Sequence, residues 1–502
     1  MIRQCLKISM SGLLALTAYF GCLSALPTVG ATGDTTPPAA VTITSGTPTS
    51  FYVKLNWNAP ADDGSNAASG SAAKYDLRYS LSPINASNWA NAKEVPFVTA
   101  PGTYNSAQWK TVSGLMPSTT YYFGLRTIDD AGNPSTISTK TITTGAQSCE
   151  KTITFNNNVT KVYGYAGTNN SGKQYLGSDT QGKVVCLASG SRTNPLELID
   201  IQGTEDAPIK LVNSDGAFSI DTNNAGFGLK ITNSKYFQLS GAGVSSIQRG
   251  IIIESVGPAL QVKSGSSFYE IDHVDIVGTS SVGMQLHSDF GCTPDTDFSR
   301  DSGFVQKEAN IHDNRIINTG AEGIYLGNSH YNEQKSIVCD GVTVPKREHA
   351  VEGVRVYNNV TAYTGWDGIQ VGGATKDVKV YNNTVGYFSE SNEHFQRSGI
   401  EINPGTTGDV FNNTIKYGTG HGIHYHGRGD SNIFNNLIID TTDASIYIDD
   451  KTDPLDPGFY QGPIRVMNNT LVDPGSFGIE YRNDAAIGSL FYNNAFIVPN
   501  LG

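Results

Sequence analysis

Charged residues are scarce in this sequence: they make up 16% of its 502 residues, against roughly a quarter in an average soluble domain. No run of Lys or Arg stands out and the formal net charge is −12, which argues against nucleic acid as a partner. The 55 Gly and 40 Asn argue against helix bundles and coiled coils, which need Ala, Leu, Glu and Lys in quantity. Hydrophobic residues, at 38%, suffice for a packed core, so the composition predicts a turn-rich, mostly β protein.

Long apolar runs are also lacking, except near the N-terminus. There a basic start and an apolar stretch over residues 10–23 are followed by small residues at 29–31. This order is typical of a secretory signal peptide over residues 1–31. A lipoprotein signal at Cys22 is the alternative, but the bulky residues before that cysteine disfavour it. No second run of 18 apolar residues follows, so we expect a secreted, periplasmic or cell-surface protein without membrane insertion.

Cysteine is rare as well, and four cysteines remain once the signal peptide is removed: Cys149, Cys186, Cys292 and Cys339. Their spacing fits no zinc motif, and an even number in an exported chain favours disulfides. Cys292 and Cys339 lie in loops that leave the same strand position on neighbouring coils of the repeat described below. We therefore predict that these two pair with each other, and that Cys149 pairs with Cys186.

After a Thr/Pro/Gly-rich linker over residues 32–38, residues 39–145 alternate in the manner of short strands separated by turns. The segment resembles a fibronectin type III domain, because it contains that family's Leu-x-Pro-x-Thr-x-Tyr signature at residues 115–121. The resemblance implies a β-sandwich with Tyr121 as its corner tyrosine. Such domains in exported enzymes serve as spacers or bring the enzyme close to its substrate, so we expect no chemistry here.

Residues 149–502 form a repeat with two alternating motifs. The first is apolar-x-Asn-Asn-x-apolar, and its Asn pairs begin 24, 30, 23, 33 and 25 residues apart. The second is Gly-apolar-x-apolar. A period of 20–45 residues built from short strands is typical of a solenoid. The Asn pairs are 358–359, 382–383, 412–413, 435–436, 468–469 and 493–494.

These motifs favour a parallel β-helix. Asn tolerates left-handed backbone angles, so each pair marks a turn between strands. Coils stacked about 4.8 Å apart let identical Asn side chains hydrogen-bond along the stack. The segment resembles the right-handed parallel β-helix of the pectate-lyase-like superfamily. The repeat continues to Val498 without a terminal cap, so we expect a truncated fragment or an end covered by another chain.

Outward positions of the second motif align into columns on successive coils, and three columns combine into one polar face. We expect a groove there with a glycine-floored gap at Gly327 and Gly372, edged by the loops 288–308, 328–351 and 387–397. All nine His lie between residues 273 and 426, and the single Trp of the β-helix adjoins this face. The three columns are Gln285, Tyr325, Gln370, Glu401, His424, Tyr447 and Glu480; Gly327, Gly372, Asn403 and His426; and Glu322, Asp367, Ser398 and His421.

Two enzyme families have related patterns. Residues 366–369, 400–402 and 420–423 resemble the order of polygalacturonase motifs, although one Glu replaces that family's Asp pair. This resemblance implies acid/base roles for Asp367 and Glu401 and an orienting or binding role for His421. Residues 204–210, 399–402 and 426–430 resemble the chondroitinase B and alginate lyase family, which implies a Ca²⁺ site near Glu401.

We therefore predict a monomeric, polysaccharide-acting protein, and hydrolysis by paired carboxyl groups is the leading hypothesis. The predicted catalytic residues are Glu322, Asp367, Glu401 and His421. The predicted substrate-binding residues are Tyr325, Trp366, Gln370, Asn403, His424, His426 and Arg428. Hydrolysis needs no cofactor. The first alternative is a uronic-acid lyase, whose base and neutralising cation would come from Tyr325, Lys346, Arg347, His424 or Arg428, with Ca²⁺ as a candidate cofactor. The second is a non-catalytic carbohydrate binder.

Overall fold

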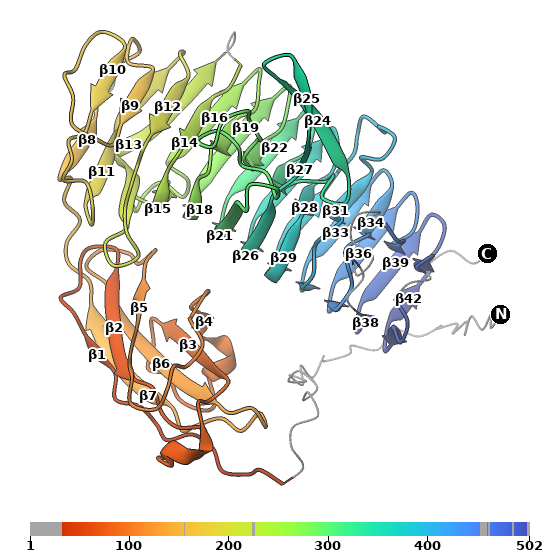
Figure 1. The fold of residues 1–502 in the computed structure, drawn as a ribbon. Coiled ribbons are helices and arrows are strands. Elements are labelled where there is room, and N and C mark those ends of the chain that lie inside the picture. Colours follow the sequence, from red (N-terminus) through yellow and green to blue (C-terminus); the bar gives the residue numbers. More distant parts are fainter. Residues whose placement is uncertain are drawn as a thin grey trace.

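The computed structural model describes residues 33–154, 156–222, 226–451, 459, 462–483 and 486–498. The predicted signal peptide lies outside these residues. Figure 1 shows a small β unit (red to orange) beneath the first coils of a long stack of parallel strands that runs from yellow to blue. No helix among the described residues is long and apolar enough to cross a membrane.

The N-terminal unit consists of two antiparallel sheets around a shared core. Inward residues alternate along its strands, as at Val53, Leu55 and Trp57, and pack with Tyr75 and Leu77 of the other sheet. One sheet has the order β1 (Thr44–Ser45), β2 (Val53–Asn58), β5 (Ala107–Val112). The other has the order β4 (Lys93–Glu94), β3 (Lys74–Ser80), β6 (Thr120–Ile128), β7 (Ser138–Thr143), and short 3-10 helices span η1 (Ala67–Ser69) and η2 (Trp89–Asn91).

The remaining strands wind into a parallel β-helix with three faces, here called sheets I, II and III. Sheet I contains β8 (Lys151–Ile153), β11 (Val184–Arg192), β13 (Ile209–Thr222), β15 (Lys235–Ser240), β18 (Ser267–Asp272), β21 (Val305–His312), β26 (Ala350–Tyr357), β29 (Ala374–Tyr381), β32 (Asp409–Phe411), β35 (Ser431–Phe434), β38 (Ile464–Met467) and β41 (Leu490–Tyr492). Sheet II begins in the second half of β11, which pairs with the second half of β13, and continues with β16 (Ile251–Ser255), β19 (Val274–Thr279), β22 (Arg315–Thr319), β27 (Val360–Thr364), β30 (Thr384–Gly386), β33 (Thr414–Gly418), β36 (Leu437–Thr441), β39 (Thr470–Pro474) and β42 (Ala495–Ile497).

Sheet III carries the predicted site. Its order is β10 (Lys173–Tyr175), β9 (Lys161–Tyr163), β12 (Leu196–Ile199), β14 (Leu229–Thr232), β17 (Leu260–Lys263), β20 (Met284–Leu286), β23 (Ile324–Gly327), β28 (Ile369–Gly372), β31 (Ser398–Ile402), β34 (His421–Tyr425), β37 (Ile446–Ile448) and β40 (Ile479–Tyr481). All pairings in this sheet are parallel.

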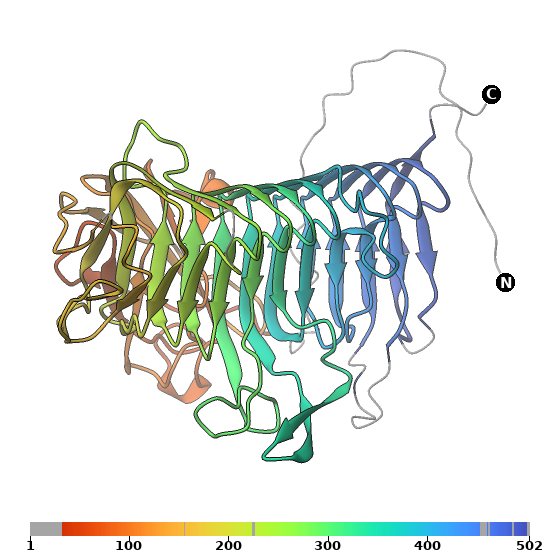
Figure 2. The same cartoon turned by 90° about the horizontal axis from the view of Figure 1, so that it is seen from above.

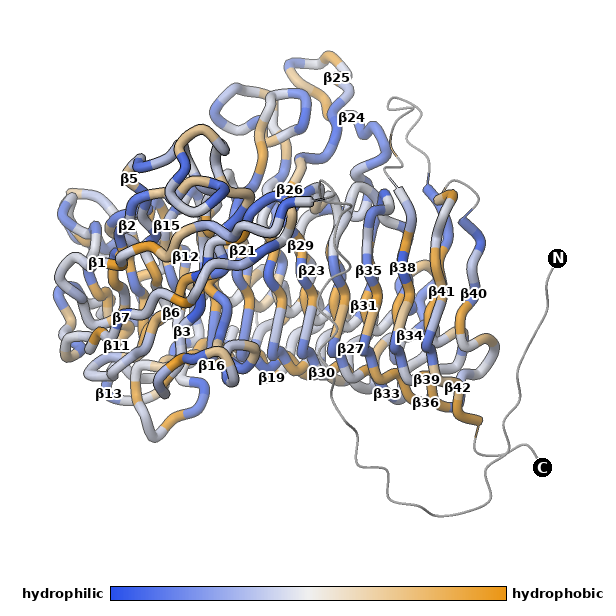
Figure 3. Tube along the Cα trace, turned by 90° about the horizontal axis from the view of Figure 1, so that it is seen from below, coloured by the Kyte–Doolittle hydropathy of each residue, from blue (hydrophilic) through white to orange (hydrophobic). Residues whose placement is uncertain are grey.

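The core of the β-helix is one continuous column of Ile, Val and Leu side chains from Ile153 to the last coils. Alternation in each strand directs one side chain inward and the next outward. Figure 3 shows the apolar stretches of successive coils lying beside one another along the stack. In the last described strands, Phe491, Phe496 and Ile497 are exposed.

A ladder of Asn side chains joins the turns between sheets I and II, as the paired Asn motif predicted. The first Asn of each pair has a left-handed backbone, as at Asn382 (φ 56°) and Asn412 (φ 55°). The second is buried and accepts from the coil before it: Oδ1 of Asn413 receives the backbone N–H and Nδ2 of Asn383, both at 3.0 Å. The ladder includes one member without a preceding Asn, Asn314, whose turn begins with Asp313.

Both predicted disulfides are present. Cys149 pairs with Cys186 and Cys292 pairs with Cys339, with Cα atoms 5.5 and 5.4 Å apart. The second bond ties loop 288–308 to the hairpin of β24 (Gln334–Cys339) and β25 (Val342–Arg347). Figure 2 shows this hairpin projecting from the side of the β-helix.

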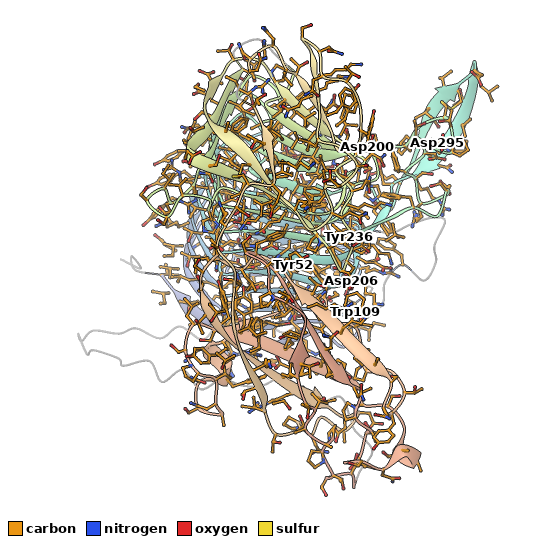
Figure 4. The ribbon with its side chains drawn as sticks, turned by 90° about the vertical axis from the view of Figure 1, so that its left-hand side faces the viewer. Tyr52, Trp109, Asp200, Asp206, Tyr236 and Asp295 are labelled. Carbon is orange, nitrogen blue, oxygen red and sulfur yellow. A yellow bond between two sulfur atoms is a disulfide. The ribbon has the colours of Figure 1, made fainter. Side chains whose placement is uncertain are left out.

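The N-terminal unit packs on the outer face of sheet I. Lys54 Nζ lies 2.6 Å from Oδ1 of Asp206 and 4.1 Å from the centre of the Trp109 ring. Figure 4 shows Trp109 and Tyr52 of the N-terminal unit on the same side of the molecule as Asp206 and Tyr236 of the β-helix. Further along the stack, Lys379 Nζ lies 2.8 Å from Oε1 of Glu94. Ion pairs thus hold the unit at two separate places.

We expect Asn413→Ala to lower the free energy of unfolding by about 3 kcal/mol or more, because two donors of Asn383 lose their acceptor inside the protein. Asn412→Gly, at the exposed left-handed position beside it, should be nearly neutral because Gly adopts that backbone freely. Urea denaturation followed by circular dichroism would measure both. Equal effects of the two variants would contradict a structural role of the ladder.

Candidate functional site

The residues predicted to form outward columns lie at aligned positions on successive strands of sheet III. Its register pairs Tyr325 with Gln370, Gln370 with Glu401, and Glu401 with His424, and continues to Tyr447 and then to Glu480. Residues that precede these strands also align, since Ser398 pairs with His421. The predicted columns are therefore present, whereas their function stays a prediction.

Three carboxyl groups gather beneath this face. Glu322, Asp367 and Glu401 come from consecutive coils and are only 3%, 0% and 3% exposed. Oδ1 of Asp367 accepts the backbone N–H of Ser398 at 2.6 Å, while Oε2 of Glu401 accepts the Ser398 hydroxyl at 3.4 Å. Among the described residues, no Lys or Arg forms an ion pair with any of the three. Two of the three carboxyl groups thus lack any cationic partner.

Burial and mutual repulsion separate the protonation states of these groups. Burial, reinforced by the negative charge of Glu401, raises the pKa of Asp367 well above its usual range. The same two causes raise the pKa of Glu322 to about 7. Burial would also raise the pKa of Glu401, but the hydrogen bond and charge of His426 outweigh it and lower that pKa. Of this pair, Asp367 therefore holds its proton more strongly, and Glu401 ionises first.

Several buried polar atoms around these carboxyl groups have no hydrogen-bond partner among the described residues. Gln370 is 1% exposed, and neither its Oε1 nor its Nε2 has a partner. The same holds for Oε2 of Glu322 and Nδ2 of Asn403, whereas the carboxyl groups of Asp367 and Glu401 lie close enough to share a hydrogen bond. Buried polar groups in native proteins are nearly always satisfied, and exceptions gather where a ligand or ordered water binds. This set of atoms marks the strongest candidate for a binding site on sheet III.

Two histidines and an aspartate border the carboxyl groups on the next coils. Nε2 of His426 lies 2.7 Å from Oδ1 of Asn403 and 3.3 Å from Oε1 of Glu401. Asp449 Oδ1 lies 3.3 Å from His424 Nε2 and 3.4 Å from His426 Nδ1. Burial lowers the pKa of His424, whereas the carboxylates of Asp449 and Glu401 outweigh burial at His426 and raise its pKa.

The other predicted site residues lie around this centre. His421 stacks on Tyr447, with ring centres 4.5 Å apart, and burial lowers its pKa to about 4. The hydroxyl of Tyr325 lies 3.1 Å from that of Ser329, and burial raises the pKa of Tyr325 to about 12. Trp366 is half-buried in the turn that precedes β28.

The positive side chains proposed for a lyase lie away from the carboxyl groups. Nε of Arg428 donates to the carbonyl of Phe459 at 3.2 Å. Lys346 and Arg347 belong to the β24–β25 hairpin, where they form ion pairs with Asp297 and Asp301. Loop 288–308 and the hairpin are thus joined into one wall at the carboxyl ends of the sheet III strands. Loop 387–397 adjoins the opposite ends, where Ser389 N–H donates to the carbonyl of Trp366 at 2.9 Å.

The predicted glycine-floored gap is wrong. A Cβ at Gly327 would lie 1.9 Å from the carbonyl oxygen of Gly372, and one at Gly372 would lie 2.2 Å from the carbonyl oxygen of Asn328. The two glycines therefore permit close backbone approach between coils, and main chain fills the expected space.

Sequence reasoning missed Asp449. The register that pairs Tyr425 with Ile448 places Asp449 directly after His426 in the second outward column. Extending that column by one coil would have identified it. Loop 288–308 and the hairpin were expected to edge the groove, but their ion pairs could not be read from any repeat position.

A comparison with protein families supports the β-helix in the second half of the chain. A family model described as a right handed beta helix region matches residues 340–500. The solved alginate lyase from Paenibacillus sp. str. FPU-7 is 13% identical, with 63% of this chain and 93% of that chain covered and a TM-score of 0.36. The Yersinia enterocolitica family 28 exopolygalacturonase is 12% identical, covering 92% and 99%, with a TM-score of 0.26. A human fibronectin type-III domain is 18% identical, covering 23% and 94%, with a TM-score of 0.17. No curated protein matches the chain.

The raised pKa of Glu322 predicts a pH-dependent stability. The unfolded chain releases this proton near pH 4.5 and the folded chain near 7, so the native state loses stability as pH rises between them, by about 3 kcal/mol. The Glu322→Gln variant lacks this ionisable group. The difference in free energy of unfolding between the variant and the unsubstituted protein should therefore shift in favour of the variant from pH 5 to pH 8. Urea denaturation at both pH values would measure the change. A difference independent of pH would contradict the burial of an ionisable Glu322.

Proposed function

We propose that this protein is a polysaccharide-acting enzyme that hydrolyses glycosidic bonds with the carboxyl groups of Glu322, Asp367 and Glu401. One observation carries the proposal: three buried carboxyl groups lie among unpartnered polar atoms on consecutive coils, and no Lys or Arg of the described part of the chain forms an ion pair with them. Unpaired buried acids reduce stability, so they are expected where catalysis requires them.

The environments of the carboxyl groups suit acid and base roles. Hydrolysis of a glycosidic bond requires one carboxylic acid to protonate the leaving oxygen, while a carboxylate activates water or attacks the sugar. A neutral Asp367 beside an ionised Glu401 supplies this combination, and Glu322 is a second candidate acid. His426 supports the ionised state of Glu401. The amides of Gln370 and Asn403 offer hydrogen bonds to sugar hydroxyls.

Access to these groups requires a local rearrangement, because none of the three carboxyl groups is more than 3% exposed. The half-buried side chains of Tyr325 and His424 occupy the adjoining positions in the same column. Movement of these side chains, with Trp366 at the edge of the face, would open the carboxyl groups to a sugar.

The proposal includes an exported monomer with an N-terminal fibronectin type III domain. The hydroxyl of Tyr121 accepts the backbone N–H of Met116 at 2.9 Å, which is the hydrogen bond of a tyrosine corner. The three-stranded and four-stranded sheets of the N-terminal unit agree with that fold. The two disulfides fit an extracellular or periplasmic protein, since such bonds persist in oxidising compartments.

Asp367→Asn and Glu401→Gln should each reduce turnover about 100-fold or more on a substrate identified from a polysaccharide panel, because each removes an acid or base group. Release of reducing ends would measure the rate. Glu480→Gln serves as the matched control, since Glu480 faces outward in the same column three coils from Glu401 and should leave the rate unchanged.

Full activity in both carboxyl variants would overturn the proposed site. Products with ultraviolet absorbance from an unsaturated sugar would instead identify a lyase, and affinity for a polysaccharide without bond cleavage would identify a binding protein.

A further inference from the structure

A second group of side chains on sheet III has the donor set of a metal site. One donor atom each from Glu401, His424 and His426 lie within 4.8 Å of one another. Asp449, the neighbour that completes the second column, places Oδ1 at 3.3 Å from His424 Nε2 and at 3.4 Å from His426 Nδ1. In a tetrahedral site with ligands about 2.1 Å from a zinc ion, neighbouring ligand atoms lie about 3.4 Å apart. Both distances from Asp449 to the histidines match that spacing.

The orientation of His426 points to the same place. Its side chain is only 8% exposed, and its Nδ1 faces Oδ1 of Asp449 at 3.4 Å, within ion-pair distance. The other ring nitrogen, Nε2, is directed at Asn403 and Glu401. A histidine that ligates a metal typically donates its second ring N–H to a carboxylate or carbonyl oxygen, which fixes the ring. His426 has this arrangement, with Glu401 and Asn403 behind it.

We propose that His424, His426 and Asp449 bind a divalent transition-metal ion such as Zn²⁺, with Glu401 orienting His426. Imidazole nitrogens suit Zn²⁺ and its neighbours, whereas Ca²⁺ selects oxygen ligands. His424 and Asp449 are 17% and 18% exposed, so an ion at this position remains reachable from solvent. The ammonium of Lys451 lies 3.7 Å from Oδ2 of Asp449, which leaves Oδ1 directed at the imidazoles. The ion would lie beside the carboxyl groups of the proposed hydrolase and does not depend on that activity.

The test uses the untagged full chain, stripped with EDTA and dialysed, and titrated with Zn²⁺ or Co²⁺ by calorimetry. We expect one ion per chain and a rise in melting temperature on Zn²⁺ addition. Binding should be at least tenfold weaker in His424→Ala and His426→Ala, and weaker in Asp449→Asn. His421→Ala is the matched control, because His421 lies on the same strand as His424 but stacks on Tyr447. The affinity of this variant for Zn²⁺ should be unchanged.

The visible spectrum of Co²⁺ bound to the unsubstituted chain provides a second measurement, which does not depend on the folding of any variant. This spectrum reports whether nitrogen and oxygen ligands surround the ion in a tetrahedral arrangement. Sub-stoichiometric binding by the unsubstituted chain would overturn the proposal. Unchanged affinity in both histidine variants would do the same, as would a site that binds Ca²⁺ in preference to Zn²⁺. Loss of hydrolysis without loss of Zn²⁺ binding, as expected in Asp367→Asn, would separate this site from the proposed catalytic groups.

Discussion

The buried ladder of Asn amides is the contact on which the β-helix depends. From Asn359 onward, each Oδ1 accepts two donors from the preceding coil, and each Nδ2 donates to a carbonyl of that coil, as Asn383 does to Val356 at 2.9 Å. A turn buried without such partners would leave main-chain N–H groups unsatisfied, which is costly. The ladder therefore fixes the turns between sheets I and II from Asn314 to Asn494, and with them the register of the strands that follow.

That register also determines the chemistry of sheet III. Because strand spacing is about 4.8 Å, any two outward residues at the same position on adjacent coils become close neighbours. Gln370, Glu401 and His424 meet in this way, and Asp367 is held against Glu401 by the N–H of Ser398. A solenoid can thus create a buried acidic group from residues that are about 30 positions apart in sequence.

The repeat made much of this predictable. The Asn pairs identified the turns, and the alternation around Ile400 and Ile402 identified Glu401 as an outward residue. Cys292 and Cys339 were paired from their equivalent places on neighbouring coils. The degree of burial was different: the 0% exposure of Asp367 depends on side chains and loops whose packing no periodicity encodes. Likewise, the close backbone approach at Gly327 and Gly372 arises from coil-to-coil geometry, which a composition of small residues does not distinguish from an open gap.

The two ion pairs of the N-terminal unit have a mechanical consequence. Asp206 precedes β13 and Lys379 lies in β29, so the contacts are separated by five coil steps, or roughly 24 Å along the axis. In a solenoid each coil contacts only its neighbours, and local opening propagates one coil at a time. A rigid unit bound at both places opposes the separation of the coils that lie between them. Hydrogen exchange should therefore be slower in the coils between Asp206 and β29 than in the coils after β29.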